Sequence, residues 1–399
     1  MFSKSLFHHR EFRYLGVFYL HSLIRLFAIA LFQIFNGIYI YQVLIKFGLN
    51  NVQSLSLTCL TFAFLFLINT LSIAPALWVI NKKGLRFSVL WGNIFLIAFY
   101  LTLYLAKFDP FLLIISSILG GLQISFYWIA YHLYFVELTD DQKQGREISI
   151  SAALSAVASI GGPALGGLLI NFGSFNALFW VMIILVIVAI YPLKFLPKRD
   201  NKVEIDISKT LLALSPRKEF KSYLTFFGQS ISGYTFMIFW PLFSLPILKG
   251  MIDLGFMGSI NALVVTIVAL VTGFLVDKFG PKRMVSFASI IESLMWVIMS
   301  FVSLPWQVYY ASSLSVMFRE INNISIDAMV YERARHSDFV AFIIQREFGL
   351  GTGRLVFFLL VGIMLWFGLA IPYIFLMAAA SVLLTRLYPF DIEKAAKRG

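Results

Sequence analysis

The chain has 399 residues, of which 60% are hydrophobic and only 13% are charged, and its mean hydropathy is +0.85. A soluble globular protein has about a quarter of its residues charged. The apolar residues form seven long runs without Asp, Glu, Lys or Arg, and each run is long enough to cross a bilayer at least once. The composition therefore indicates an integral membrane protein.

The net charge of +12 is informative mainly through where the charges lie along the chain. If the apolar runs cross the membrane in turn, the loops on the side of the termini contain 26 of the 32 Lys and Arg residues. The opposite loops contain only Lys46, Lys107 and Lys249. By the positive-inside rule, we expect both termini to face the cytoplasm and the protein to lie in an inner (cytoplasmic) membrane. The charge then reports topology, and we expect no nucleic-acid partner.

The predicted transmembrane helices, in chain order, are residues 18–44, 53–80, 86–106, 110–136, 147–170, 174–196, 221–247, 253–276, 284–304, 306–331, 345–367 and 370–389. Turn-forming residues at 171–176, 304–305 and 368–372 separate neighbouring helices where the sequence is apolar throughout. The sequence therefore predicts an all-α membrane protein with twelve transmembrane helices.

One polar segment, residues 197–221, is long enough to divide the twelve helices into two groups of six. We expect two six-helix half-bundles, 1–197 and 221–399, joined by a cytoplasmic linker at 198–220. A weak internal repeat supports this division, because residues 81–86 after the second helix match residues 277–282 after the eighth. Parallel half-repeats are typical of transporters that bind their substrate between the halves.

Enzymatic signatures are missing from the sequence. It has no phosphate-binding P-loop, no H-E-x-x-H and no G-x-S-x-G motif. Its single cysteine, Cys59, lies in an apolar run and forms neither an internal disulfide nor a thiol-based metal site. We expect no enzymatic activity, no metal and no cofactor.

The loop after the eighth helix reads Gly273-Phe-Leu-Val-Asp277-Lys278-Phe-Gly280-Pro-Lys282-Arg283. Gly280 allows a tight turn, Asp277 is placed to cap a helix or pair with a cation, and the basic residues favour the membrane surface. This stretch resembles the loop signature of the major facilitator superfamily, where the loop would stabilise one conformation of a half-bundle. The first-half copy departs from the signature, with Leu77 and Asn81 in place of the glycine and the acid. It is therefore open whether this loop stabilises one conformation of its half-bundle.

The fifth helix contains a row of small residues, Ala158, Gly162, Pro163, Gly166 and Gly167. Ser155, Ala158, Gly162 and Gly166 are spaced three or four apart and share one helix face. Small residues let another helix approach closely, and the proline adds a kink. The stretch resembles the G-x-x-x-G-P-x-x-G-G motif of the superfamily's twelve-helix drug:proton antiporters, with alanine at the first position. Together with the loop signature and the helix layout, the resemblance covers the whole chain and implies a major facilitator fold and proton-coupled export. Generic helix packing is the alternative interpretation of the row.

Charged and polar groups inside the later helices are costly in lipid and usually face a cavity or a partner. They are Glu292, Arg319, Glu320, Asn323, Asp327 and Arg354. We predict that they bind substrate or carry a coupling proton. Glu320 is our first choice for the proton, because a carboxylate in a low-dielectric site can hold a proton near neutral pH. The alternative is a buried ion-pair network that only holds helices nine to eleven together.

The first helix contributes two further candidates, Gln33 and Asn36, which we predict to line the cavity. Arg25 is followed by 20 uncharged residues, and we interpret it as marking the cytoplasmic edge of this helix. Gln123, Tyr127 and Gln229 fit a cavity wall and a helix-to-helix hydrogen bond equally well.

These features predict a monomeric secondary active transporter that works by alternating access on a small-molecule substrate, with the proton gradient as its energy source. The first hypothesis is proton-coupled efflux of a small amphipathic compound. An alternative is a proton symporter that imports a polar or anionic metabolite, with Arg319 or Arg354 holding the anion. A third hypothesis is a receptor or scaffold of the same fold that does not transport.

Overall fold

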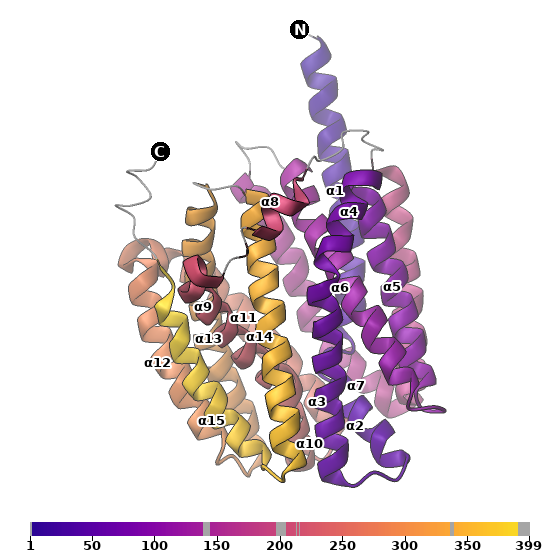
Figure 1. Ribbon diagram of the computed structural model, residues 1–399, viewed down its shortest axis with the longest axis vertical. Helices are drawn as coiled ribbons and strands as arrows, with labels where there is room; N and C mark the ends of the chain where they lie inside the picture. The colour runs from indigo at the N-terminus through magenta and orange to yellow at the C-terminus, as the bar shows by residue number, and fades with distance from the viewer. Residues whose placement is uncertain are drawn as a thin grey trace.

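The computed structural model describes residues 2–138, 144–196, 205–212, 214, 216–335 and 339–389, and no β-strand occurs in these ranges. The helices run side by side as one bundle (Figure 1). This is the arrangement expected of long apolar segments in a bilayer, because only intrahelical hydrogen bonds satisfy their backbone groups there.

The first part of the chain forms the helices on the right of Figure 1: α1 (Phe2–Ala30), α2 (Asn36–Lys46), α3 (Asn51–Leu71), α4 (Ile73–Lys83), α5 (Leu85–Leu105), α6 (Leu112–Leu138), α7 (Gln144–Ile190) and η1 (Tyr191–Phe195). The long helix α7 contains two crossings. Ser174 interrupts it with φ 63° and ψ 176°, within the turn predicted at 171–176.

The remaining helices lie mainly on the left of Figure 1: α8 (Ile207–Leu212), α9 (Pro216–Tyr234), η2 (Thr235–Phe239), α10 (Trp240–Leu248), α11 (Met251–Phe279), α12 (Pro281–Met299), α13 (Pro305–Arg335), α14 (Phe339–Trp366), α15 (Ile371–Val382) and η3 (Leu383–Leu387). The short helix α8 belongs to the predicted linker. The elements from α9 to η3 form six membrane crossings, and the elements from α1 to η1 form the other six.

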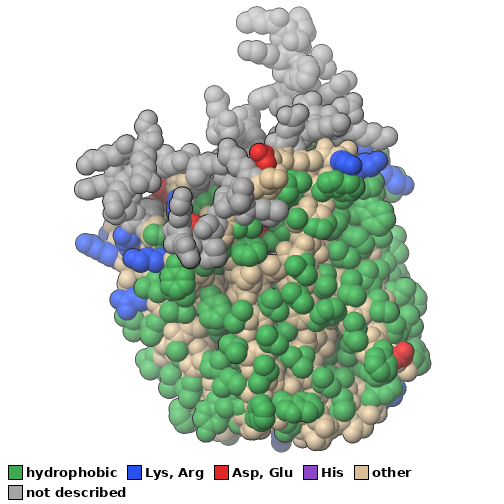
Figure 2. All heavy atoms as spheres, in the orientation of Figure 1, with side chains coloured by type: hydrophobic (Ala, Val, Ile, Leu, Met, Phe, Trp, Pro, Cys, Tyr) green, Lys and Arg blue, Asp and Glu red, His purple; other side chains and the backbone are tan. Residues whose placement is uncertain are grey.

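The predicted all-α fold with twelve transmembrane helices is confirmed. Seven of the described helices are long and apolar enough to cross a membrane by themselves, and shorter apolar helices complete other crossings. Hydrophobic side chains cover most of the face seen in Figure 2, whereas Lys and Arg gather mainly toward the end at which α1 begins. The domain limits at 197 and 221 stay a prediction, because residues 197–204 lie outside the described ranges.

Three of the predicted helices are interrupted, which corrects the expectation of continuous helices. The first crossing breaks between Ala30 and Asn36, and the second breaks at Ser72. Pro75 explains the second break, because a proline ring clashes with the carbonyl four residues earlier, that of Leu71. The seventh crossing contains the π-helical turn η2, which precedes Pro241.

Two helix pairs join the first and second parts of the bundle. In one, α3 packs along α14, and the Ser56 hydroxyl donates a hydrogen bond of 2.6 Å to the Gly362 carbonyl. In the other, α7 packs along α11, and the Ala164 amide donates to the Ser259 hydroxyl at 3.0 Å. The space between these two pairs contains most of the polar site residues predicted from the sequence.

Candidate substrate cavity

A cavity with two lobes lies between the two parts of the bundle. Lobe one has a volume of about 520 Å³ and is lined by α1, α7, α9, η2, α10, α11, α13 and α14. Lobe two has a volume of about 460 Å³ and is lined by α1, α2, α3, α5, α6, α9, η2 and α14. The lobes share part of their walls, including Gln33, Tyr234, Met237 and Arg354. Each is large enough for a small organic molecule.

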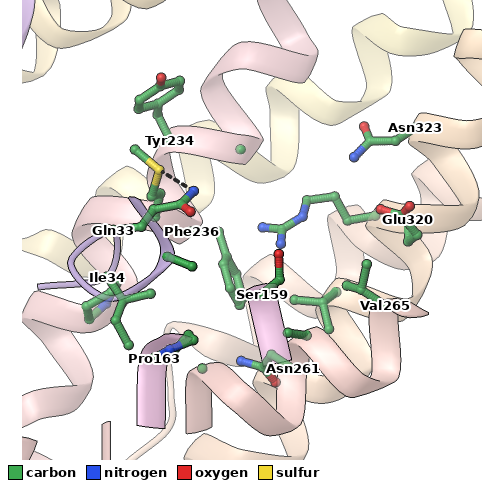
Figure 3. Close-up of a pocket in the computed structure, with 18 of the residues that line it drawn as sticks. Gln33, Ile34, Ser159, Pro163, Tyr234, Phe236, Asn261, Val265, Glu320 and Asn323 are labelled. Atoms are coloured by element: carbon green, nitrogen blue, oxygen red, sulfur yellow. Dashed lines mark hydrogen bonds between the residues drawn. The ribbon is translucent and has the colours of Figure 1, made fainter. Parts of the chain in front are cut away.

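Irregular backbone from the first and seventh crossings meets at the shared wall. Gln33, in the break between α1 and α2, donates a hydrogen bond of 3.1 Å to the Met237 sulfur in η2. Figure 3 shows this contact beside Tyr234, with Glu320 and Asn323 on the other side of the cavity. Gly37 lies so close to Ile238 that a Cβ there would overlap its side chain. Non-helical backbone at membrane depth is tolerated where it lines a cavity.

The helix α13 brings three of the predicted site residues to lobe one. Asn323 hydrogen bonds with Glu320 and also accepts a bond of 2.9 Å from Gln229. The Arg319 guanidinium lies 4.0 Å from the centroid of the Phe236 ring, and its buried Nη1 has no hydrogen-bond partner. Arg319 lies within electrostatic range of Glu292 and Glu320, but it forms no ion pair with either in the described part of the chain.

Arg354 of α14 faces both lobes. Its guanidinium lies 5.0 Å from the Tyr234 ring centroid and 5.5 Å from that of Phe66. Its buried Nε has no hydrogen-bond partner, and no carboxylate of the described residues pairs with it. A cation over aromatic faces that lacks a counter-charge is a suitable partner for an anionic group.

Two of the predicted site residues lie off the cavity wall. Asp327 accepts from Arg346 at 3.3 Å, and Arg346 also lies 3.8 Å from a Glu347 oxygen. Arg346, which is not among the predicted site residues, lies on the wall of both lobes.

Glu292 is the other predicted site residue that lies off the cavity wall, and it is only 1% exposed. Its oxygens accept hydrogen bonds from Ser232 at 2.5 Å and from Asn322 at 3.1 Å. Trp296 donates to the same Ser232 hydroxyl at 3.1 Å. This network joins α9, α12 and α13 behind the cavity wall through neutral partners, so Glu292 has structural contacts that differ from the predicted ion-pair network.

In the first crossing, Gln33 lines both lobes and Asn36 lines lobe two. The interpretation of Arg25 as an edge residue is wrong, because Arg25 is 0% exposed and lies inside the bundle. It donates to Gln123 at 2.9 Å and lies 3.3 Å from the Tyr127 ring centroid. Burial of this arginine depends on the packing of α1 against α6, which hydropathy does not report.

The two copies of the loop signature differ in their surroundings. In the second copy, Gly280 has φ 84°, and the exposed Asp277 forms no hydrogen bond or ion pair within the described ranges. Gly273 is open, since a Cβ there would touch nothing, and the basic residues Lys278, Lys282 and Arg283 are exposed. In the first copy, Asn81 binds the linker, donating to the Ile205 carbonyl at 2.7 Å and accepting from its amide at 3.1 Å.

The row of small residues in α7 packs on both parts of the bundle. A Cβ at Gly162 or Gly166 would overlap Ala30 or the Leu31 carbonyl, next to the break after α1. A Cβ at Gly167 would overlap the Met251 carbonyl of α11. Pro163 lines lobe one, and Ala158 is buried in the same row. The row therefore brings the broken first crossing, α7 and α11 into close contact.

Comparison with known proteins agrees with this architecture. A sequence profile described as Major Facilitator Superfamily matches residues 22–225, about half of the chain. The uncharacterized protein YqgE of Bacillus subtilis (strain 168) is 23% identical over 341 residues, which cover 82% of this chain and 77% of that protein.

Solved transporters share the fold at low sequence identity. The POT family transporter PepTSo superposes with a TM-score of 0.74 at 11% identity, over 97% of this chain and 99% of that one. A D-xylose-proton symporter superposes with a TM-score of 0.71 at 12% identity, over 94% of this chain and 97% of that one. With its multi-pass helices and central cavity, this chain belongs to the major facilitator superfamily and is a secondary transporter of that type.

Proposed function

We propose that this transporter carries a small organic anion and couples its movement to a proton held by Glu320. The observation that carries the proposal is Arg354, which faces both lobes between two aromatic rings and has no carboxylate partner in the described residues. Arg319 supplies a second cation on the wall of lobe one. Arginine presents its donors in a planar fork that fits a carboxylate.

The position of Glu320 beside Arg319 supports co-binding of proton and anion. An ionised Glu320 attracts Arg319 and repels an incoming anion, and both effects are strong in a site of low dielectric. Protonation removes that negative charge and leaves Arg319 and Arg354 available to the substrate. Binding of a proton and binding of an anion therefore favour each other, which is the requirement for symport.

Proton-coupled efflux of a small amphipathic compound is the second candidate. It is supported by the row of small residues in α7, which matches the antiporter motif except for Ala158. Aromatic rings also line the cavity, among them Phe66, Tyr234 and Phe236. Apolar and aromatic walls suit an amphipathic ligand, whereas Arg354 suits its anionic group.

The test is transport by the purified full chain in liposomes that contain a pH-sensitive dye. A panel of organic anions, lipophilic cations and sugars is added under an imposed proton gradient. We expect organic anions to drive proton movement in the same direction as the anion. Opposite movement with lipophilic cations would support efflux, and binding without movement of solute would support a receptor or scaffold.

Arg354→Gln makes the test specific for the proposed site. We expect this variant to lose anion-driven proton movement, while Arg386→Gln, the same change at an exposed arginine of η3, retains it. Full anion transport by Arg354→Gln would contradict the proposed site.

A further inference from the structure

Arg25 is a buried cation that the proposed transport cycle does not use. Its side chain is fully buried, its Nε and Nη1 have no hydrogen-bond partner, and no carboxylate of the described residues pairs with it. The sequence explains the missing counter-charge, since Asp109 is the only acidic residue between Glu11 and Glu137. An uncompensated charge inside a membrane protein is expensive and points to a functional role.

The groups around Arg25 are neutral and aromatic. Its guanidinium lies 3.3 Å from the Tyr127 ring centroid and 5.7 Å from that of Trp128, and Tyr100 lies within electrostatic range. His21 lies nearby and is occupied, with Nδ1 2.7 Å from the Ala189 carbonyl and Nε2 3.3 Å from the Tyr127 hydroxyl. These rings stabilise the cation but leave its positive charge uncancelled.

Gln123 connects this cation to the cavity. Arginine only donates hydrogen bonds, so the Gln123 group 2.9 Å from the Arg25 Nη2 is its amide oxygen. The NH₂ group of Gln123 is therefore turned away from Arg25, and Gln123 lines lobe two. Trp128 and Tyr100, which flank Arg25, line the same lobe. Lobe two thus has a hydrogen-bond donor on its first-half wall with a positive charge directly behind it.

The opposite wall of lobe two carries Arg354, on α14. The other charged groups of this wall compensate one another, because Arg346 lies within ion-pair distance of both Asp327 and Glu347. Two uncompensated cations therefore face the lobe from opposite sides, Arg354 directly and Arg25 through Gln123.

We infer that lobe two binds a substrate with two anionic groups, such as a short dicarboxylate, with one group on Arg354 and the other on the Gln123–Arg25 pair. This inference rests on the proposed transport of an organic anion and names its class. Such a substrate would join the two parts of the bundle, because α6 and α14 each hold one end of it. A monoanion would leave the second donor site empty.

The test compares each dicarboxylate with its own monomethyl ester. Succinate, glutarate and adipate, and the three monoesters, are titrated by calorimetry into the purified full chain and into Gln123→Glu. A charge-assisted hydrogen bond is lost with each ester, so we expect the matching diacid to bind about tenfold more tightly to the unmodified protein. We expect Gln123→Glu to lose this preference, since its new carboxylate pairs with Arg25.

Thermal unfolding separates recognition from structure. Because Gln123→Glu gives Arg25 a counter-charge, its unliganded midpoint should equal or exceed that of the unmodified protein. Gln229→Glu adds the same charge to lobe one and should weaken diacid and monoester alike. Equal affinities for diacid and monoester, both dependent on Arg354, would overturn this inference and leave the proposed function intact. Failure of the unmodified protein to bind any of these anions would overturn both.

Discussion

The two walls of the cavity are built from different chemistry. The second-half wall exposes Arg319, Glu320 and Arg354, and further acids lie behind or beside them. The first-half wall exposes the amides Gln33 and Gln123. Arg25, the cation behind this wall in the described part of the chain, is separated from the cavity by the Gln123 amide. The difference teaches that ionisable groups can lie on a cavity surface where opposite charges are close together. The first-half wall has no acid among its described lining residues, and its cation lies behind neutral groups.

The largest effect should come from removing the titratable group of the second-half wall. Glu320→Gln keeps the shape of the side chain but cannot bind and release a proton, so we expect proton movement with substrate to be abolished. Liposome assays with a pH dye measure this loss. The matched control is Glu332→Gln, the same change at the exposed end of the same helix, which should transport normally. Full coupling in Glu320→Gln would assign the proton to another group.

The first half should respond instead to changes in packing. Gly166→Ala places a methyl group on the Leu31 carbonyl, and overpacking of this kind destabilises by about 1–3 kcal/mol. A lower midpoint of thermal unfolding in detergent would show it. Gly161→Ala is the control, because its Cβ would meet only Phe27 at 3.5 Å, an ordinary contact. Equal stability of the two variants would show that the close approach of Gly166 to the Leu31 carbonyl does not limit the size of the residue at this position.

Glu292 tests whether a second-half acid can be structural. Glu292→Gln replaces one carboxylate oxygen with an NH₂ group, which cannot accept the bond from Ser232 or Asn322. Leaving a buried donor unpaired costs about 1–3 kcal/mol, so the unfolding midpoint should fall. Because this side chain is absent from the cavity wall, the affinity for substrate should stay within about twofold, a difference worth less than 1 kcal/mol. Loss of proton coupling with unchanged stability would point to a direct role for Glu292.

The smallest effect should come from the two loop copies. Asn81→Asp loses the donor to the Ile205 carbonyl, a hydrogen bond worth about 1 kcal/mol. Asp277→Asn changes an exposed side chain and should leave the unfolding midpoint unchanged. Thermal unfolding of both variants in parallel measures the contrast. A lower unfolding midpoint for Asp277→Asn than for Asn81→Asp would contradict this expectation. It would show that the loop copy that matches the family signature better also contributes more to stability.

The membrane crossings can be predicted from the sequence, whereas the contacts of the side chains cannot. Helix limits followed from runs of apolar residues, and the turn at 171–176 was expected from its Gly, Ser and Asn residues. The charges of α13 are recognisable in the sequence because charged side chains are unusual within a membrane span. Glu320 is the first choice for the proton from the sequence, but no sequence signal separates it from Glu292, because both are carboxylates within apolar helices. Their difference depends on which neighbours surround each one.

The sequence by itself determined the membrane-spanning architecture and the family, because hydropathy and segment length act locally and the motifs are contiguous. Only the tertiary structure decided which polar groups meet at the cavity. Arg25 binds Gln123, 98 residues further along the chain, and Gln229 binds Asn323, 94 residues further along. Such contacts depend on how each helix is rotated against its neighbours, and that rotation is set by packing between distant segments.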